Sequence, residues 1–130
     1  MFAWRGKMLV ADLSAGTVRT EELPEDLLRR WLGGRGLGAH LMRDFITLDP
    51  FDETMPLCFA VGPLCGTGAP ASARLSVVSR SPLTGTIFES SAGGAFPLKL
   101  KQAGFDAVMV TGKAQDPVYL DVRNGRASLK

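Results

Sequence analysis

The run of small and polar residues from Glu89 to Gly94 is the part of this sequence best suited to bind an anion. It reads ESSAGG, follows an apolar stretch, and precedes a segment with helical spacing. A strand, a Ser/Gly loop and a helix start together direct free backbone N–H groups toward a negative charge. Ser91 and Gly93 belong to this loop, and Arg74, one strand earlier, is expected to reach it and bind phosphate. An N-cap serine followed by glycines that allow tight packing explains the same residues, so both interpretations stay open.

Two further charged residues, Glu89 and Arg35, are candidates for polar contacts. Glu89 precedes the serines and could orient a polar group, although solvent is its expected neighbour. Arg35 lies between Gly34 and Gly36, where the glycines are explained by one helix ending and another beginning. An arginine in such a link could also meet an anion. The chain has no G-x-x-x-x-G-K-[ST] phosphate loop, and no G-x-G-x-x-G follows a strand, so neither nucleotide motif is present.

No side chain qualifies as a catalytic residue on the sequence alone. Cys58 lies in an apolar run and is expected to pack as a small hydrophobe, whereas Cys65 lies in a Gly/Pro-rich loop and could be a ligand. An iron–sulfur cluster usually needs four protein ligands and zinc needs a similar set, which two cysteines and one histidine do not supply. His40 is expected to be an ordinary helix histidine. The loop GPLCGTGAP, between two apolar strands, is of the kind that often carries function.

The elements that must position these residues follow from apolar spacing and turn residues. We expect a hairpin over residues 7–22, a helix from Pro24 to Gly33, and a second helix from about 37 to 46. Strands follow near 57–62, 74–80 and 86–90. A third helix begins after SAGG, with Phe96, Leu100 and Ala103 on its inner face, and a strand near 106–111 precedes a hairpin around Asn124-Gly125. This order predicts an α+β domain with mixed or antiparallel β-sheets and about three helices.

Composition excludes several classes of protein. The chain has 130 residues, 45% hydrophobic and 22% charged, which predicts one packed domain covering residues 1–130. Its formal net charge of +2 is spread among interspersed acids and bases, which argues against a nucleic-acid partner. No apolar run approaches the roughly 20 residues of a membrane span, and the N-terminus does not resemble a signal peptide. Two cysteines give no disulfide framework, so a cytoplasmic location is the expectation.

Four segments together resemble the N-terminal domain of the tungsten-containing aldehyde ferredoxin oxidoreductases. They are WRGKMLVADLSAGTV, LGGRGLGAHLM, VGPLCGTGAPASARLSVVSRSPLTG and SAGGAFPLKLKQAGFDAVMVTGKAQDPVYL, in order over nearly the whole chain. The resemblance implies an oxidoreductase that converts aldehydes to carboxylic acids and passes electrons through a [4Fe–4S] cluster to ferredoxin. It implies a tungsten (or molybdenum) bis-pterin cofactor with a bridging magnesium ion, lying on a β-rich base formed by this domain.

The same resemblance assigns roles to three residues. Arg74 matches a pterin-contacting arginine, and Gly93 matches a pterin-contacting backbone position. Ser91 matches the position whose main-chain carbonyl binds magnesium, where family members often have asparagine; a carbonyl ligand survives that change of side chain.

The family's cluster cysteines and acid–base residues have no counterpart in these 130 residues. The chain alone is therefore expected to be inactive and to need the remaining domains or a catalytic subunit, with later domains absent from this sequence. The alternative is a non-catalytic binding or assembly module, or a small subunit that docks onto a larger catalytic chain or forms a homo-oligomer. The natural substrate is not predicted.

Overall fold

The computed structural model describes residues 3–130, which form eight strands, three α-helices and one 3₁₀ turn. In chain order the elements are β1 (Lys7–Asp12), β2 (Thr17–Glu22), α1 (Glu25–Trp31), α2 (Gly34–Met42), the 3₁₀ turn η1 (Arg43–Phe45), β3 (Leu57–Val61), β4 (Leu75–Arg80), β5 (Ile87–Ala92), α3 (Ala95–Gln102), β6 (Ala107–Thr111), β7 (Leu120–Arg123) and β8 (Arg126–Leu129). The predicted α+β class and the predicted order of strands and helices are both confirmed.

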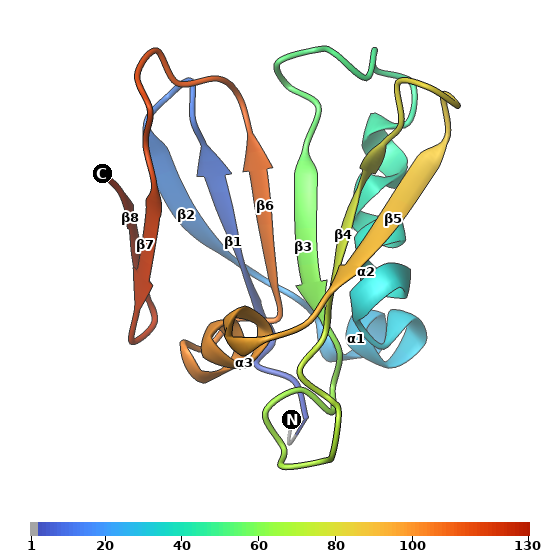
Figure 1. Ribbon diagram of the computed structural model, residues 1–130, viewed down its shortest axis with the longest axis vertical. Helices are drawn as coiled ribbons and strands as arrows, with labels where there is room; N and C mark the ends of the chain where they lie inside the picture. Colours follow the sequence, from blue (N-terminus) through green and yellow to red (C-terminus); the bar gives the residue numbers. More distant parts are fainter. Residues whose placement is uncertain (1–2) are drawn as a thin grey trace.

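Six strands form one mixed sheet in the order β2-β1-β6-β3-β4-β5, and β7 and β8 form a separate antiparallel pair. The β1–β6 pair is parallel, whereas the other neighbours in the large sheet are antiparallel. In the β7–β8 turn, Asn124 and Gly125 both have positive φ, 49° and 76°, as the Asn-Gly hairpin signal requires. Strand β5 is an edge of the large sheet (Figure 1).

The large sheet buries a different apolar cluster on each face. Successive strand residues point to opposite faces, so Val10 packs with the α1 and α2 residues Leu28 and Leu37 on one side. On the other side Leu9 packs with Leu100 of α3. Figure 1 shows α1 and α2 behind β4 and β5, with α3 and the β7–β8 pair in front of the sheet.

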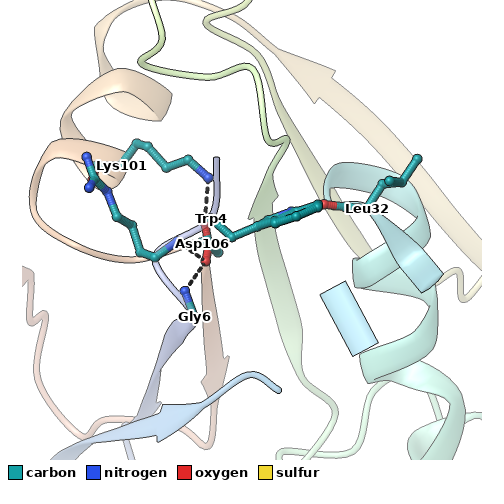
Figure 2. A network of polar contacts seen from close by, with 6 residues as sticks. Trp4, Gly6, Leu32, Lys101 and Asp106 are labelled. Carbon is teal, nitrogen blue, oxygen red and sulfur yellow. Dashed lines mark hydrogen bonds and ion pairs between the residues drawn. The ribbon is translucent and has the colours of Figure 1, made fainter. Parts of the chain in front are cut away.

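A polar network fastens the N-terminal segment to the sheet. The Asp106 carboxylate accepts the backbone N–H groups of Arg5 and Gly6, each at 2.7 Å, and forms an ion pair with Lys101. Asp106 and Lys101 are both almost fully buried. Trp4 donates its Nε1–H to the carbonyl of Leu32 at the end of α1 (Figure 2). One short segment therefore links α1 to the turn between α3 and β6.

Two helix predictions need correction. The second helix begins at Gly34 and ends at Met42, three residues earlier than expected at its start, because the chain enters α2 directly after Gly33. In α3, Leu100 is buried as expected, but Phe96 is 53% exposed. Pro97 is buried in its place, since α3 begins at Ala95 and turns Phe96 outward.

Candidate anion-binding site

An open hollow lies at the end of the sheet where β3 ends and β4 begins. Figure 1 shows the 62–74 loop, the start of α3 and the link between α1 and α2 at this same end. The hollow has a volume of about 460 Å³, and we call it the Arg74 hollow. It is lined by loop residues 62–65 and 70–72, by Arg74, Leu75 and Ser76 at the start of β4, and by Leu32, Gly34 and Ser91.

Arg74 supplies the one charged side chain among the described residues that line the Arg74 hollow. It immediately precedes β4 and is exposed. Within residues 3–130 no carboxylate forms an ion pair with its guanidinium. A guanidinium that is not neutralised by its own chain and lies beside hydroxyl groups is suited to bind phosphate.

Ser91 also lines the Arg74 hollow, but it does so from a strand and not from a helix-start loop. Strand β5 continues through Ala92, so the helix-start interpretation is wrong for Ser90 and Ser91. Ser91 lies opposite Ser76 in the β4–β5 register, which places two serines side by side in the wall. Because β5 is an edge strand, alternate backbone groups along it have no strand on their outer side.

Gly93 follows β5 directly, and nothing inside residues 3–130 requires it to be glycine. Its φ is not in the left-handed region, and an added Cβ would meet no atom closer than the Ala73 carbonyl oxygen at 3.7 Å. Gly94, the N-cap of α3, has a φ of 98° and makes no side-chain capping bond. The first N–H groups of α3 therefore have no capping side chain within the described part of the chain.

Glu89 does not face solvent as expected. Its carboxylate accepts the Ser91 hydroxyl at 2.7 Å and lies 3.3 Å from the Arg35 guanidinium, and only 16% of the side chain is exposed. Hydrogen bonds from Ser91 and then Ser76, together with the charge of Arg35, lower the pKa of Glu89 below its ordinary value. The arginine between two glycines thus does meet an anion, and that anion is Glu89.

The remaining candidate ligands lie in structural roles. Cys58 is buried, and desolvation raises the pKa of its thiol to about 12. Cys65 is also buried, in the wall of the Arg74 hollow, and desolvation raises the pKa of its thiol. His40 stacks on Trp31 with ring centroids 4.9 Å apart, and desolvation lowers its pKa. Within residues 3–130 no three His, Cys, Asp or Glu side chains lie close enough to hold a metal together.

Sequence reasoning found part of the Arg74 hollow and missed part of it. The GPLCGTGAP loop, singled out as a functional candidate, does supply lining residues. Ser76 is a lining residue that the sequence analysis does not predict. A polar serine among the apolar residues of the strand LSVVSR, at a buried position, could have indicated it. The ion pair of Lys101 and Asp106 was also missed, and no short-range pattern marks it.

The fold and the Arg74 hollow define a class of protein, an α+β domain with a hollow lined by an arginine and serines at one end of a mixed sheet. Residues 8–130 match the family model described as "Aldehyde ferredoxin oxidoreductase, N-terminal domain". The chain belongs to this family.

The relatives agree with this assignment over the full length of the chain. It is 41% identical over 132 residues to the tungsten-containing aldehyde ferredoxin oxidoreductase of Pyrococcus horikoshii, which covers 100% of this chain and 22% of that protein. It is 36% identical over 135 residues to the WOR-like subunit of an aliphatic sulfonate oxidoreductase of Pyrococcus furiosus, covering 100% of this chain and 21% of that protein. The chain spans about a fifth of the length of these relatives.

A solved structure shows the same fold. It is described as the active site complex BamBC of benzoyl coenzyme A reductase with 1,5-dienoyl-CoA, and it superposes with a TM-score of 0.94 at 32% identity. The match covers 99% of this chain and 20% of that one. No helix within residues 3–130 has the length and apolar character needed to cross a bilayer.

Proposed function

We propose that this chain forms the cofactor-facing base of a tungsten or molybdenum bis-pterin oxidoreductase. In this proposal the Arg74 guanidinium binds a pterin phosphate, and the main-chain carbonyl of Ser91 binds the bridging magnesium ion. The backbone at Gly93 contacts the pterin. The observation that carries the proposal is the Arg74 hollow, where an arginine without an ion-pair partner among residues 3–130 lies beside serine hydroxyls.

The donor set fits a phosphate-bearing ligand. No acidic side chain belongs to the described lining of the Arg74 hollow, and the Arg74 guanidinium is its cationic donor. The hydroxyls of Ser72 and Ser91 already donate to the Ala69 carbonyl and to Glu89. Gly93 leaves the backbone bare beside the end of β5 without any internal need for glycine. A ligand in contact with this backbone would explain the glycine, because the Cβ of any other residue would occupy the space that the ligand needs.

The reaction class rests on the family and on the relatives' names. The cofactor, when bound, supplies a two-electron redox centre, and we propose that the complete enzyme oxidises aldehydes to carboxylic acids. The electrons would then be passed to ferredoxin by a [4Fe–4S] cluster held outside these 130 residues. Relatives of this chain are named for an aldehyde and for an aliphatic sulfonate, so this domain's fold is shared by enzymes that act on different compounds.

The chain's own contribution to that reaction is binding and orientation. Arg74 and the strand–helix junction at Gly93 would hold the phosphate end of the ligand, and the described lining contains no histidine, aspartate or glutamate side chain. Both cysteines are buried and too few to ligate a [4Fe–4S] cluster, so the cluster ligands have to come from outside these 130 residues. Activity therefore requires the remaining domains or a catalytic subunit.

The alternative function is a binding or assembly module without cofactor. The observation in its favour is the apolar surface near α3, where Phe96 is 53% exposed and its ring lies 6.3 Å from that of Phe59. Such a surface is suited to contact another domain, a larger chain or a second copy.

Metal and phosphate analysis separates the two functions. The chain is purified without chelators from a host grown with tungstate and molybdate, and metal and phosphate are measured per chain. The proposal predicts both components in the unmodified chain and their loss from Arg74→Ala, because a hydrogen bond to a charged group contributes about 1.5–3 kcal/mol. Arg29→Ala, an exposed arginine on α1, is the control. An unmodified chain that holds neither component would favour the assembly module.

A further inference from the structure

The second arginine near the Arg74 hollow is Arg35, in the first turn of α2. Its neighbour Gly34 lines the hollow, and its guanidinium Nη2 lies 3.3 Å from Glu89 Oε2. The other oxygen of the same carboxylate accepts the hydroxyl of Ser91, which also lines the hollow. One carboxylate therefore separates the Arg35 guanidinium from the wall of the Arg74 hollow.

The contact between Arg35 and Glu89 is loose. It is a single interaction at 3.3 Å, and 76% of the Arg35 side chain is exposed. Exposed ion pairs of this kind contribute little stability. The Arg35 side chain can therefore leave the Glu89 carboxylate with a small loss of free energy.

Glu89 is the tightly held partner of the pair. Only 16% of the Glu89 side chain is exposed, and its carboxylate also accepts the Ser91 hydroxyl at 2.7 Å, independently of its contact with Arg35 through the other oxygen. A carboxylate that keeps its hydroxyl donor is not left unsatisfied when the arginine moves away. These contacts favour movement of the Arg35 side chain from Glu89 to a ligand while Glu89 stays in place.

We propose that Arg35 is a second anion-binding side chain of the Arg74 hollow, held on Glu89 until a phosphate group enters. Glu89 acts as an internal anion that the ligand's phosphate replaces as the partner of Arg35. This inference rests on the proposed function, since it assumes that the Arg74 hollow takes phosphate. The inference extends the proposed function, because it adds Arg35 and Glu89 to a site that was assigned to Arg74, Ser91 and Gly93.

The test is a double-mutant cycle with inorganic pyrophosphate as the probe, titrated calorimetrically into the full chain. Arg35→Gln is expected to weaken binding about two- to fivefold, as for loss of one exposed charged contact. Glu89→Gln is expected to tighten binding, because Arg35 is then no longer held by a carboxylate. In the Arg35→Gln background that tightening should disappear. Arg29→Gln, which removes an exposed arginine paired with Glu25, is the matched control and should leave affinity unchanged.

The outcomes distinguish this inference from the proposed function. If Arg74→Gln weakens pyrophosphate binding while Arg35→Gln behaves as Arg29→Gln does, the inference is wrong and the role of Arg74 stands. If Glu89→Gln tightens binding equally with and without Arg35, Glu89 acts only through its general negative charge and the transfer of Arg35 is refuted. An unmodified chain that binds no pyrophosphate at millimolar concentration overturns both the phosphate site and this inference. Circular dichroism of each variant checks that it is folded.

Discussion

At the scale of single residues, the chain separates side chains that hold the fold from those left free for a ligand. The thiols of Cys58 and Cys65 are buried, and His40 is stacked on Trp31. Arg74, by contrast, is exposed and has no ion-pair partner within residues 3–130. The roles of Arg74, Ser91 and Gly93 in binding cofactor stay predictions.

Gly93→Ala tests whether glycine is needed at this position for ligand binding or for folding. An added Cβ meets nothing closer than 3.7 Å, so the free energy of unfolding should stay within about 0.5 kcal/mol of the unmodified value or rise slightly. Retention of cofactor phosphate should fall, because the Cβ would occupy space next to the backbone. Denaturant unfolding and phosphate analysis of the same preparations measure the two effects. A large loss of stability would show that the glycine has a structural role.

Single residues also show what local sequence can and cannot predict. The Gly-Arg-Gly segment is consistent with the ends of two helices or with an anion-binding arginine. In the structure these three residues form the first turn of α2, and Arg35 reaches Glu89 from there. Glu89 itself was expected in solvent. Its neighbours Arg35 and Ser76 come from distant parts of the chain, so no pattern around residue 89 could have predicted them.

At the scale of elements, α2 depends on close approach to β4. A Cβ on Gly38 would lie 2.5 Å from a methyl carbon of Val78, nearer than real contacts allow. The helix can therefore lie against the sheet only with glycine at this position. This contact matters for the Arg74 hollow, because α2 carries Gly34 and Arg35 to its edge.

Gly38→Ala should reduce the free energy of unfolding by about 1–3 kcal/mol, the range for overpacking a well-filled core. Val78 is β-branched and stiff, so it has little freedom to move aside. The double variant Gly38→Ala with Val78→Ala should lose less stability than the two single changes added together. Urea unfolding measures all three variants, and strict additivity would contradict the proposed clash.

Element boundaries were predictable where turn residues define them. Both hairpins, around Gly16 and around Asn124-Gly125, lie as predicted. The end of β5 was not predictable, because Ser90, Ser91 and Ala92 have weak strand preference and are held in the strand by pairing with β4. The helical spacing of Phe96 and Leu100 predicts that both face inward, but Phe96 is exposed, because spacing does not determine which face of a short helix is buried.

At the scale of the whole molecule, the sheet order β2-β1-β6-β3-β4-β5 decides where the Arg74 hollow lies. It places β4 and β5 together at one edge, with the 62–74 loop at their lower end (Figure 1). The α+β class could be predicted from the order of elements along the chain. The parallel pairing of β1 with β6 could not, because its partners are about 100 residues apart.

Asp106 links the N-terminal segment at Arg5 and Gly6 to Lys101 of α3, so the stability of the fold depends on this carboxylate. Asp106→Asn keeps an acceptor but leaves the buried Lys101 ammonium without its counter-charge, which should reduce the free energy of unfolding by about 3–5 kcal/mol. Adding Lys101→Met should recover much of that loss, since no unpaired charge then remains buried. Thermal and urea unfolding of the single and double variants measure this. A double variant as unstable as Asp106→Asn alone would contradict the account.

The central claim is that the Arg74 hollow is the phosphate-facing base of a cofactor site, and an amide NMR titration of the chain with magnesium pyrophosphate tests it most directly. If phosphate binds there, the backbone signals of Ser91, Gly93 and the residues next to Arg74 should shift together and saturate. The arginines of the β7–β8 hairpin, Arg123 and Arg126, do not line the Arg74 hollow and should show no comparable shifts. Shifts centred on that hairpin, or none at the end of β5, would contradict the claim.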